Sequence, residues 1–108
     1  MRKIRTYGGY FESFMATLTP EQQRKIQYGL LLLKTLDRLP TKFVKSLGEG
    51  LFELRTEFEG NIFRTFFVFD EGNVVVLFNG FQKKSRKTPR KELLLAQQLM
   101  KEYYGRAH

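Results

Sequence analysis

A dense group of cations is the first feature of this sequence that suggests chemistry. Six Lys or Arg residues fall within the nine-residue run KKSRKTPRK, from Lys83 to Lys91, and no acid interrupts them. The run lies where a helical pattern starts, and a cation there costs about 0.3 to 1 kcal/mol because the helix N-terminus is already positive. A solvated surface is the plainer interpretation of surplus charge. Crowding at one helix start instead favours a site for a polyanion, of which nucleic acid is the commonest.

Two arginines in the apolar segments before this run are further candidates. Arg64 stands inside IFRTFFVF, where a cation on a half-buried sheet face is costly unless it pairs with an acid or meets a ligand. A pair with Glu53 across the sheet is the structural alternative. Arg55 has two interpretations, because it either binds phosphate or pairs with Glu57 or Glu53. Arginine suits phosphate, since its guanidinium donates two parallel hydrogen bonds.

Such cations can serve the cleavage of RNA by its own 2′-hydroxyl. That reaction needs in-line geometry, removal of the hydroxyl proton, stabilisation of the phosphate charge and protonation of the leaving 5′-oxygen. Arg and Lys can stabilise the charge without a metal ion. The proton carriers stay open, because a Lys among the cations, Glu53 or a Tyr could act as base or acid.

Three positions beside the basic run have competing explanations. Phe81 either stacks on an RNA base or closes the end of the sheet core. Asn79 either reads a base edge or caps the strand turn, and the sequence does not decide. Thr88 and Pro89 are explained as a helix start, with Thr88 as cap and Pro89 in the first turn.

The composition excludes several other kinds of site. The chain has no Cys, and its only His is the final residue, His108, so thiol chemistry is excluded and we expect no metal site and no cofactor. The longest apolar runs are far too short to span a bilayer, and the N-terminus MRKIRTYGG lacks the apolar core of a signal peptide. We therefore expect a cytoplasmic protein with no membrane partner.

Length and charge distribution indicate one domain with one basic region. The 108 residues suit a single domain, 1–108, that buries its own core. The net charge is +8, and residues 83–108 hold eight basic but only two acidic residues. Most of the positive excess therefore lies in the last quarter of the chain.

The helical patterns predict a hairpin near the N-terminus and one helix at the C-terminus. Phe11, Phe14, Met15 and Leu18 have the spacing of a short helix. TPEQ follows, in which Thr19 can cap a second helix, Pro20 can occupy its first position and Gln22 can complete a capping box. That second helix is expected to continue to Pro40. The last helix opens at Thr88-Pro89, and its expected buried stripe is Leu93, Ala96, Leu99, Met100 and Tyr103.

The remaining apolar segments predict strands. RKIRTYGG starts with a short strand that Gly8-Gly9 ends. The segments LFELRTEF, NIFRTFFVF and NVVVLFNGF are separated by turn signals at Glu59 to Asn61 and at Asp70 to Asn73, which is typical of an antiparallel meander. The sequence therefore predicts an α+β domain, with a small antiparallel sheet of an N-terminal strand plus a three-stranded meander.

Two stretches together resemble a known family. KSLGEGLFELR, from Lys45 to Arg55, precedes GNIFRTFFVFDEGNVVVLFNGFQKKSRKTPRKE, from Gly60 to Glu92. Their order and spacing resemble the RelE/ParE toxin superfamily, most closely its HigB-like branch related to phage-derived toxins, over nearly the whole chain. The resemblance implies a RelE-like fold and the toxin of a type II toxin-antitoxin system. It implies cleavage of mRNA on the ribosome and neutralisation by a cognate helix-turn-helix antitoxin.

The resemblance also implies roles for individual residues. The strand that carries an Arg among aromatic residues, IFRTFFVF, supplies a catalytic Arg64. The basic segment, which is the run from Lys83 to Lys91, supplies Lys84 and Lys87 around the scissile phosphate. The residues expected to bind RNA are Arg55, Asn79, Phe81, Lys83, Arg86, Arg90 and Lys91.

An alternative function stays open. Several RNA-cleaving relatives carry a catalytic Tyr or His near the C-terminus, whereas Tyr103 and Tyr104 lie deep in the last predicted helix. ParE-like relatives of the same fold inhibit DNA gyrase and cleave no RNA. A gyrase inhibitor or a non-catalytic nucleic-acid-binding protein is therefore the second interpretation.

Overall fold

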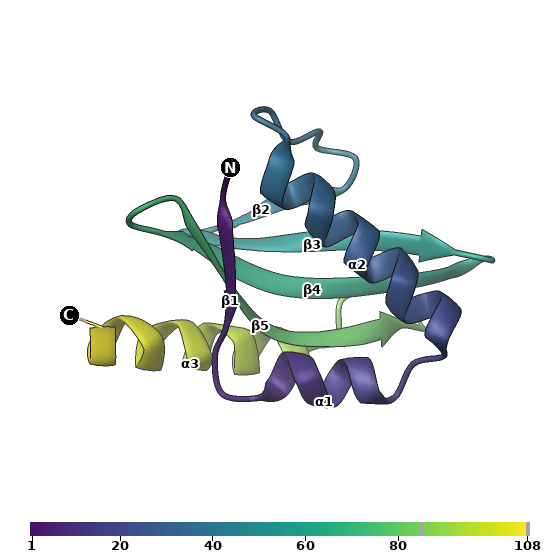
Figure 1. Ribbon diagram of the computed structural model, residues 1–108. Coiled ribbons are helices and arrows are strands. Elements are labelled where there is room, and N and C mark those ends of the chain that lie inside the picture. Colours follow the sequence, from purple (N-terminus) through teal and green to yellow (C-terminus); the bar gives the residue numbers. More distant parts are fainter. Residues whose placement is uncertain (85, 108) are drawn as a thin grey trace.

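The computed structural model describes residues 1–84 and 86–107, and it is an α+β domain with a five-stranded mixed sheet and three helices (Figure 1). His108 lies outside the described residues. The elements in chain order are β1 (Lys3–Thr6), α1 (Tyr10–Ala16), α2 (Pro20–Thr35), β2 (Val44–Gly48), β3 (Leu51–Phe58), β4 (Asn61–Asp70), β5 (Val74–Lys83) and α3 (Arg90–Ala107). No helix in this described part of the chain is long and apolar enough to cross a membrane.

The sheet confirms the predicted meander but differs from the prediction at both edges. Its order is β1-β5-β4-β3-β2, and β2 to β5 pair antiparallel. The N-terminal strand β1 pairs parallel to β5, so the prediction of a wholly antiparallel sheet is wrong. A parallel pair needs a long crossover connection, and the helices and strands between β1 and β5 supply it. The second edge strand, β2, was not predicted, because it is short and mostly exposed and so shows little apolar alternation.

A tight turn fixes the register of β3 against β4. Glu59 and Gly60 both have positive φ, 51° and 79°, which is the backbone of the two-residue turns that suit a twisted hairpin. The turn places Phe58 opposite Asn61, and the pairing continues inward to Arg55 opposite Arg64. The turn predicted at these residues is thus the element that aligns the two arginines.

The predicted start of α2 is confirmed, whereas its predicted end is wrong. The Thr19 hydroxyl accepts from the Gln22 amide at 3.2 Å, the Gln22 side chain accepts from the Thr19 amide at 3.0 Å, and Pro20 follows the cap. The helix ends at Thr35 rather than near Pro40. Arg2 explains this end, because its guanidinium donates to the carbonyls of Leu33 and Leu36 and satisfies them where the helix stops.

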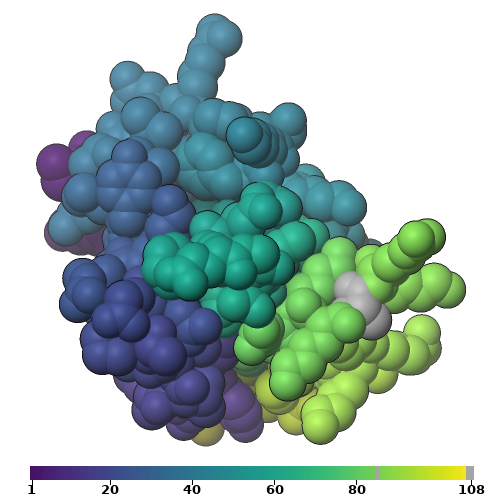
Figure 2. Space-filling view, turned by 90° about the vertical axis from the view of Figure 1, so that its right-hand side faces the viewer, coloured from purple at the N-terminus to yellow at the C-terminus, as the bar shows by residue number. Residues whose placement is uncertain are grey.

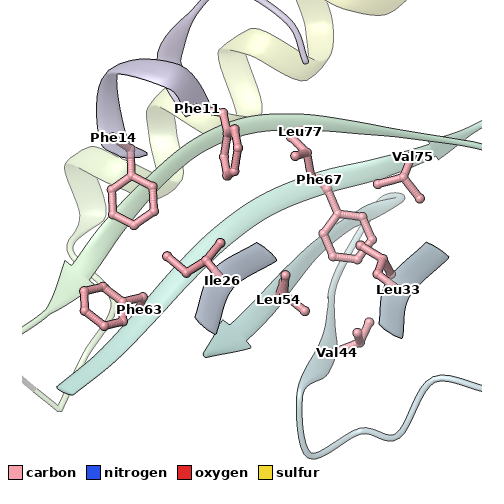
Figure 3. Close-up of a cluster of buried hydrophobic side chains, with 10 residues drawn as sticks. All are labelled: Phe11, Phe14, Ile26, Leu33, Val44, Leu54, Phe63, Phe67, Val75 and Leu77. Carbon is pink, nitrogen blue, oxygen red and sulfur yellow. The ribbon is translucent and has the colours of Figure 1, made fainter. Parts of the chain in front are cut away.

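Two apolar clusters hold the helices on opposite faces of the sheet (Figure 1). Figure 3 shows the cluster under α1 and α2, in which Phe14, Ile26 and Leu33 meet side chains of the strands. The cluster under α3 includes Ala96, Leu99 and Tyr103, which confirms the predicted buried stripe. Helix α3 starts at Arg90, directly after Pro89.

Candidate functional site

Three of the predicted site residues form one row across the sheet. Arg55 of β3 lies opposite Arg64 of β4, and Arg64 lies opposite Phe81 of β5. The row is on the α3 side of the sheet, because Phe81 belongs to the apolar cluster under α3. Register in the sheet therefore brings together residues that lie 9 and 17 positions apart in the chain.

Arg64 is held by Glu53. Its Nη1 donates to Glu53 Oε1 at 3.0 Å, and both side chains are nearly buried, at 12% and 4% exposure. Glu53 precedes Arg55 by two residues on the same strand, so both point to the same face. The structural pair that the sequence left open for Arg64 is therefore present. It fixes the guanidinium at one nitrogen, and only a small part of the Arg64 side chain stays exposed.

The buried pair leaves some hydrogen-bonding capacity unused. Arg64 Nε and Glu53 Oε2 are both buried and have no hydrogen-bond partner among the described residues. Buried polar atoms without partners are uncommon in folded proteins. Arg64 is thus anchored by an acid, and its Nε is too buried to meet a ligand unless its neighbours move.

Arg55 forms the other pair that the sequence allowed. Its Nη2 lies 3.4 Å from Glu57 Oε1, and this pair is much more exposed than that of Arg64. Exposed ion pairs contribute only about 0 to 1 kcal/mol. A phosphate can therefore compete for Arg55 at little cost, whereas Arg64 stays bound to Glu53.

The basic segment projects from the end of β5 beside this row. Lys83 is the last residue of β5 and lies two positions beyond Phe81, so it faces the same side of the sheet. The cations that follow it are exposed: Lys84, Arg86, Lys87, Arg90 and Lys91. Figure 2 shows this light-green segment beside the teal β3–β4 turn, with long side chains that extend into solvent.

The other two predicted RNA contacts are buried. Phe81 is 7% exposed and stacks on Phe66 with ring centroids 5.7 Å apart, so the core accounts for this ring and little of it is offered to a base. Asn79 is 3% exposed, and its amide donates to the backbone and side-chain oxygens of Glu92 at 3.0 and 3.1 Å. Asn79 therefore ties β5 to the first turn of α3 and helps to place the basic segment between them.

The late tyrosines lie far from the row. The Tyr103 hydroxyl donates to Asp70 at 2.5 Å, and that of Tyr104 donates to the carbonyl of Phe69 at 3.2 Å. The hydrogen bond to Asp70, with burial, raises the pKa of Tyr103, and burial raises the pKa of Tyr104. Asp70 is six residues from Arg64 along β4, about 20 Å in a strand. Both tyrosines therefore fasten α3 to the sheet away from the row.

Sequence reasoning missed one group of side chains that the fold brings to Arg55. Lys25 and Tyr28 come from α2 and Lys42 comes from the loop before β2, and all line a groove that Arg55 also lines. No motif connects these residues. Tyr28 was the one residue that could have indicated this groove in the sequence. It is a large aromatic residue on the exposed side of α2, whereas the buried residues of that helix are Ile26 and Leu33.

Comparison with known protein families gives a match over most of the chain. The sequence model of a family described as "Phage derived protein Gp49-like (DUF891)" matches residues 13–101. This span includes every residue of the row and all of the basic segment. No curated protein matches the chain.

Proposed function

We propose that this chain, which belongs to the Gp49-like family of phage-derived proteins, is a toxin that cleaves mRNA on the ribosome. The family is associated in general with toxins of toxin-antitoxin systems. The observation that carries the proposal is the Arg64 guanidinium, which Glu53 holds at 3.0 Å in a row with Arg55 and beside the basic segment.

The basic segment binds the RNA backbone in this proposal. Lys83 and Arg86 contact phosphates flanking the cut, and the remaining exposed cations add affinity without sequence preference. Lys84 and Lys87 lie around the scissile phosphate. The ribosome supplies the order of the mRNA, because positioning is worth about 7 to 11 kcal/mol of a reaction barrier and a small domain offers little surface for it.

The reaction proceeds by attack of the 2′-hydroxyl oxygen on the adjacent phosphorus. The 2′-oxygen loses its proton and forms the new P–O bond, and the bond to the 5′-oxygen breaks as that oxygen gains a proton. Arg64 stabilises the charge that develops on the phosphate oxygens. No metal ion or other cofactor takes part in the proposed reaction.

The partners follow from the proposed role. A cognate helix-turn-helix antitoxin neutralises the protein, and mRNA in the cytoplasmic ribosome is its substrate. Coexpression with the neighbouring gene is expected to yield a stable complex and to relieve toxicity.

Replacement of Arg64 tests the chemistry. Arg64→Ala is expected to lower single-turnover cleavage on programmed ribosomes about a hundredfold, because one donor to a transition-state oxyanion is worth that much. Ribosome binding should change little. Arg38→Ala, which removes an exposed Arg outside the row, is the matched control, and a melting curve checks folding in both variants.

Three results would each contradict a part of the proposal. Full cleavage by a folded Arg64→Ala protein excludes Arg64 as a catalytic residue. A wild-type protein that leaves ribosome-bound mRNA intact and inhibits DNA gyrase replaces the nuclease with the ParE-like alternative. Equal cleavage of free and ribosome-bound mRNA removes the dependence on the ribosome.

A further inference from the structure

A groove of about 460 Å³ lies between α2, the loop before β2 and the second half of β3. Its volume falls within the range of small-ligand sites. Three cations line it, Lys25, Lys42 and Arg55, together with the aromatic rings of Tyr28 and Phe43. Cations and aromatic rings together match a nucleotide, which joins a phosphate to a flat base.

Tyr28 is placed to offer its ring to a base. The residue is 53% exposed, and the Lys25 ammonium lies 5.6 Å from the ring centroid. Tyr28 also lines a second hollow of about 320 Å³, which Arg24 and Phe58 border. An exposed ring between two hollows leaves space for a nucleobase to stack on it. Stacking of this kind does not depend on the RNA sequence.

The acids at this surface are already engaged by arginines. Glu21 lies 3.5 Å from Arg24, and Glu57 lies 3.4 Å from Arg55. Because each carboxylate is paired with an arginine, its negative charge is largely compensated and repels a phosphate only weakly. Lys25 and Lys42 add two more cations, so the lining of the groove has a positive surplus.

Arg55 connects this groove to the row described above. It lines the groove, and it lies directly opposite Arg64 in the sheet. Figure 2 shows dark-blue α2 and the light-green basic segment on either side of the teal β3–β4 turn. An RNA strand that reaches both must cross this turn, because α2 and the row lie on opposite faces of the sheet.

We propose that the groove between α2 and β3 is a second RNA subsite, which binds a nucleotide of the same single strand whose phosphate lies at Arg64. The base stacks on Tyr28, and its phosphate contacts Lys25, Lys42 and Arg55. The subsite rests on the proposed function for the identity of its ligand, and it extends the contact surface beyond the basic segment to α2.

Binding of a fluorescein-labelled single-stranded hexaribonucleotide at low salt tests the subsite. Tyr28→Ala and Lys42→Glu are each expected to weaken binding about fivefold or more. The matched controls are Tyr10→Ala, an exposed tyrosine on α1, and Lys101→Glu, the same charge change on exposed α3. Both controls should bind nearly as wild type does. Photocrosslinking of the oligonucleotide should label α2 in the wild type and lose that label in Tyr28→Ala.

The other outcomes overturn the subsite without deciding the proposed function. Equal losses in the groove variants and their controls, or a wild type with no crosslink on α2, remove it. Groove variants that bind RNA normally but no longer bind the protein of the neighbouring gene assign the groove to a protein partner instead. Cleavage on ribosomes is measured in the same proteins, so a failed subsite with intact cleavage leaves the nuclease proposal standing.

Discussion

At the scale of single residues, the pair of Arg64 and Glu53 combines a structural and a proposed chemical role. A buried Arg alone is costly, and removal of one partner from a buried ion pair is strongly destabilising. Glu53 therefore allows an arginine to stand in an apolar strand at all. The sequence showed both members and their alternative roles, but only the side-chain contacts in the structure show that Glu53 binds Arg64 while Glu57 binds Arg55.

Glu53→Gln is expected to reduce both stability and cleavage. The change keeps the side-chain shape but removes the charge that compensates Arg64, and a hydrogen bond to a charged group is worth about 1.5 to 3 kcal/mol. Chemical denaturation gives the loss of stability. Glu57→Gln removes the exposed acid of Arg55 and should cost about 1 kcal/mol at most. If Glu53→Gln and Glu57→Gln lowered stability and cleavage equally, the buried pair of Glu53 and Arg64 would have no special role in positioning Arg64.

At the scale of elements, the strands are positioned by close packing that the sequence shows only in part. Gly80 of β5 lies against Phe14 of α1, and a Cβ at Gly80 would be 2.4 Å from the ring. This contact seats α1 over the second half of β5, just before the basic segment. A glycine in an apolar strand suggests such an approach, but the partner residue is known only from the fold.

Gly80→Ala is expected to destabilise the fold by about 1 to 3 kcal/mol, because the added methyl group overpacks the contact with Phe14. Denaturant titration measures the change. Gly105→Ala is the matched control, since that glycine lies in α3 with open space around it and alanine favours a helix there. A Gly80→Ala protein as stable as the control would show that Phe14 moves aside freely.

The fastening of α3 by Tyr103 predicts a dependence of stability on pH. The fold raises the pKa of Tyr103 above its ordinary 10.0, chiefly through the hydrogen bond to Asp70, so the fold favours the neutral hydroxyl. This contribution is complete below pH about 10 and is lost as pH rises through the higher folded-state pKa. The stability difference between wild type and Tyr103→Phe should therefore shrink above pH about 10, as denaturation at pH 8 to 11 would measure. Tyr10→Phe, which removes the hydroxyl of an exposed tyrosine, is the control for the substitution itself. A difference that stays constant to pH 11 would contradict this role.

At the scale of the whole molecule, charge and fold class were the features most readily predicted. Periodicity, turn residues and the capping box at Thr19 gave three helices and a meander in the correct order, because these signals are local. The parallel pairing of β1, the edge strand β2 and the groove beside α2 depend on contacts between distant segments. No local pattern at Lys25, Tyr28 or Lys42 shows that they meet Arg55.

The concentration of cations after β5 predicts how RNA binding responds to salt. Each phosphate contact on single-stranded RNA contributes about 0.7 to the slope of log affinity against log salt concentration. Lys83→Gln and Arg86→Gln should each weaken binding and lower the slope by about that amount. Lys101→Gln removes a cation on the outer side of α3 and should leave the slope unchanged. Equal slopes in all of these proteins would indicate binding by overall charge rather than by the segment.

The parallel pairing of the edge strand β1 with the N-terminal half of β5 has a consequence for biosynthesis. Lys3 is translated well before its sheet neighbour, Val74, which follows it by 71 positions in the chain. Closure of so long a loop is entropically unfavourable and slow. A nascent chain that stalls before Val74 lacks β5, the strand that pairs with β1. It also lacks Phe81 and the basic segment. The proposed activity therefore belongs only to chains that have been translated past the basic segment.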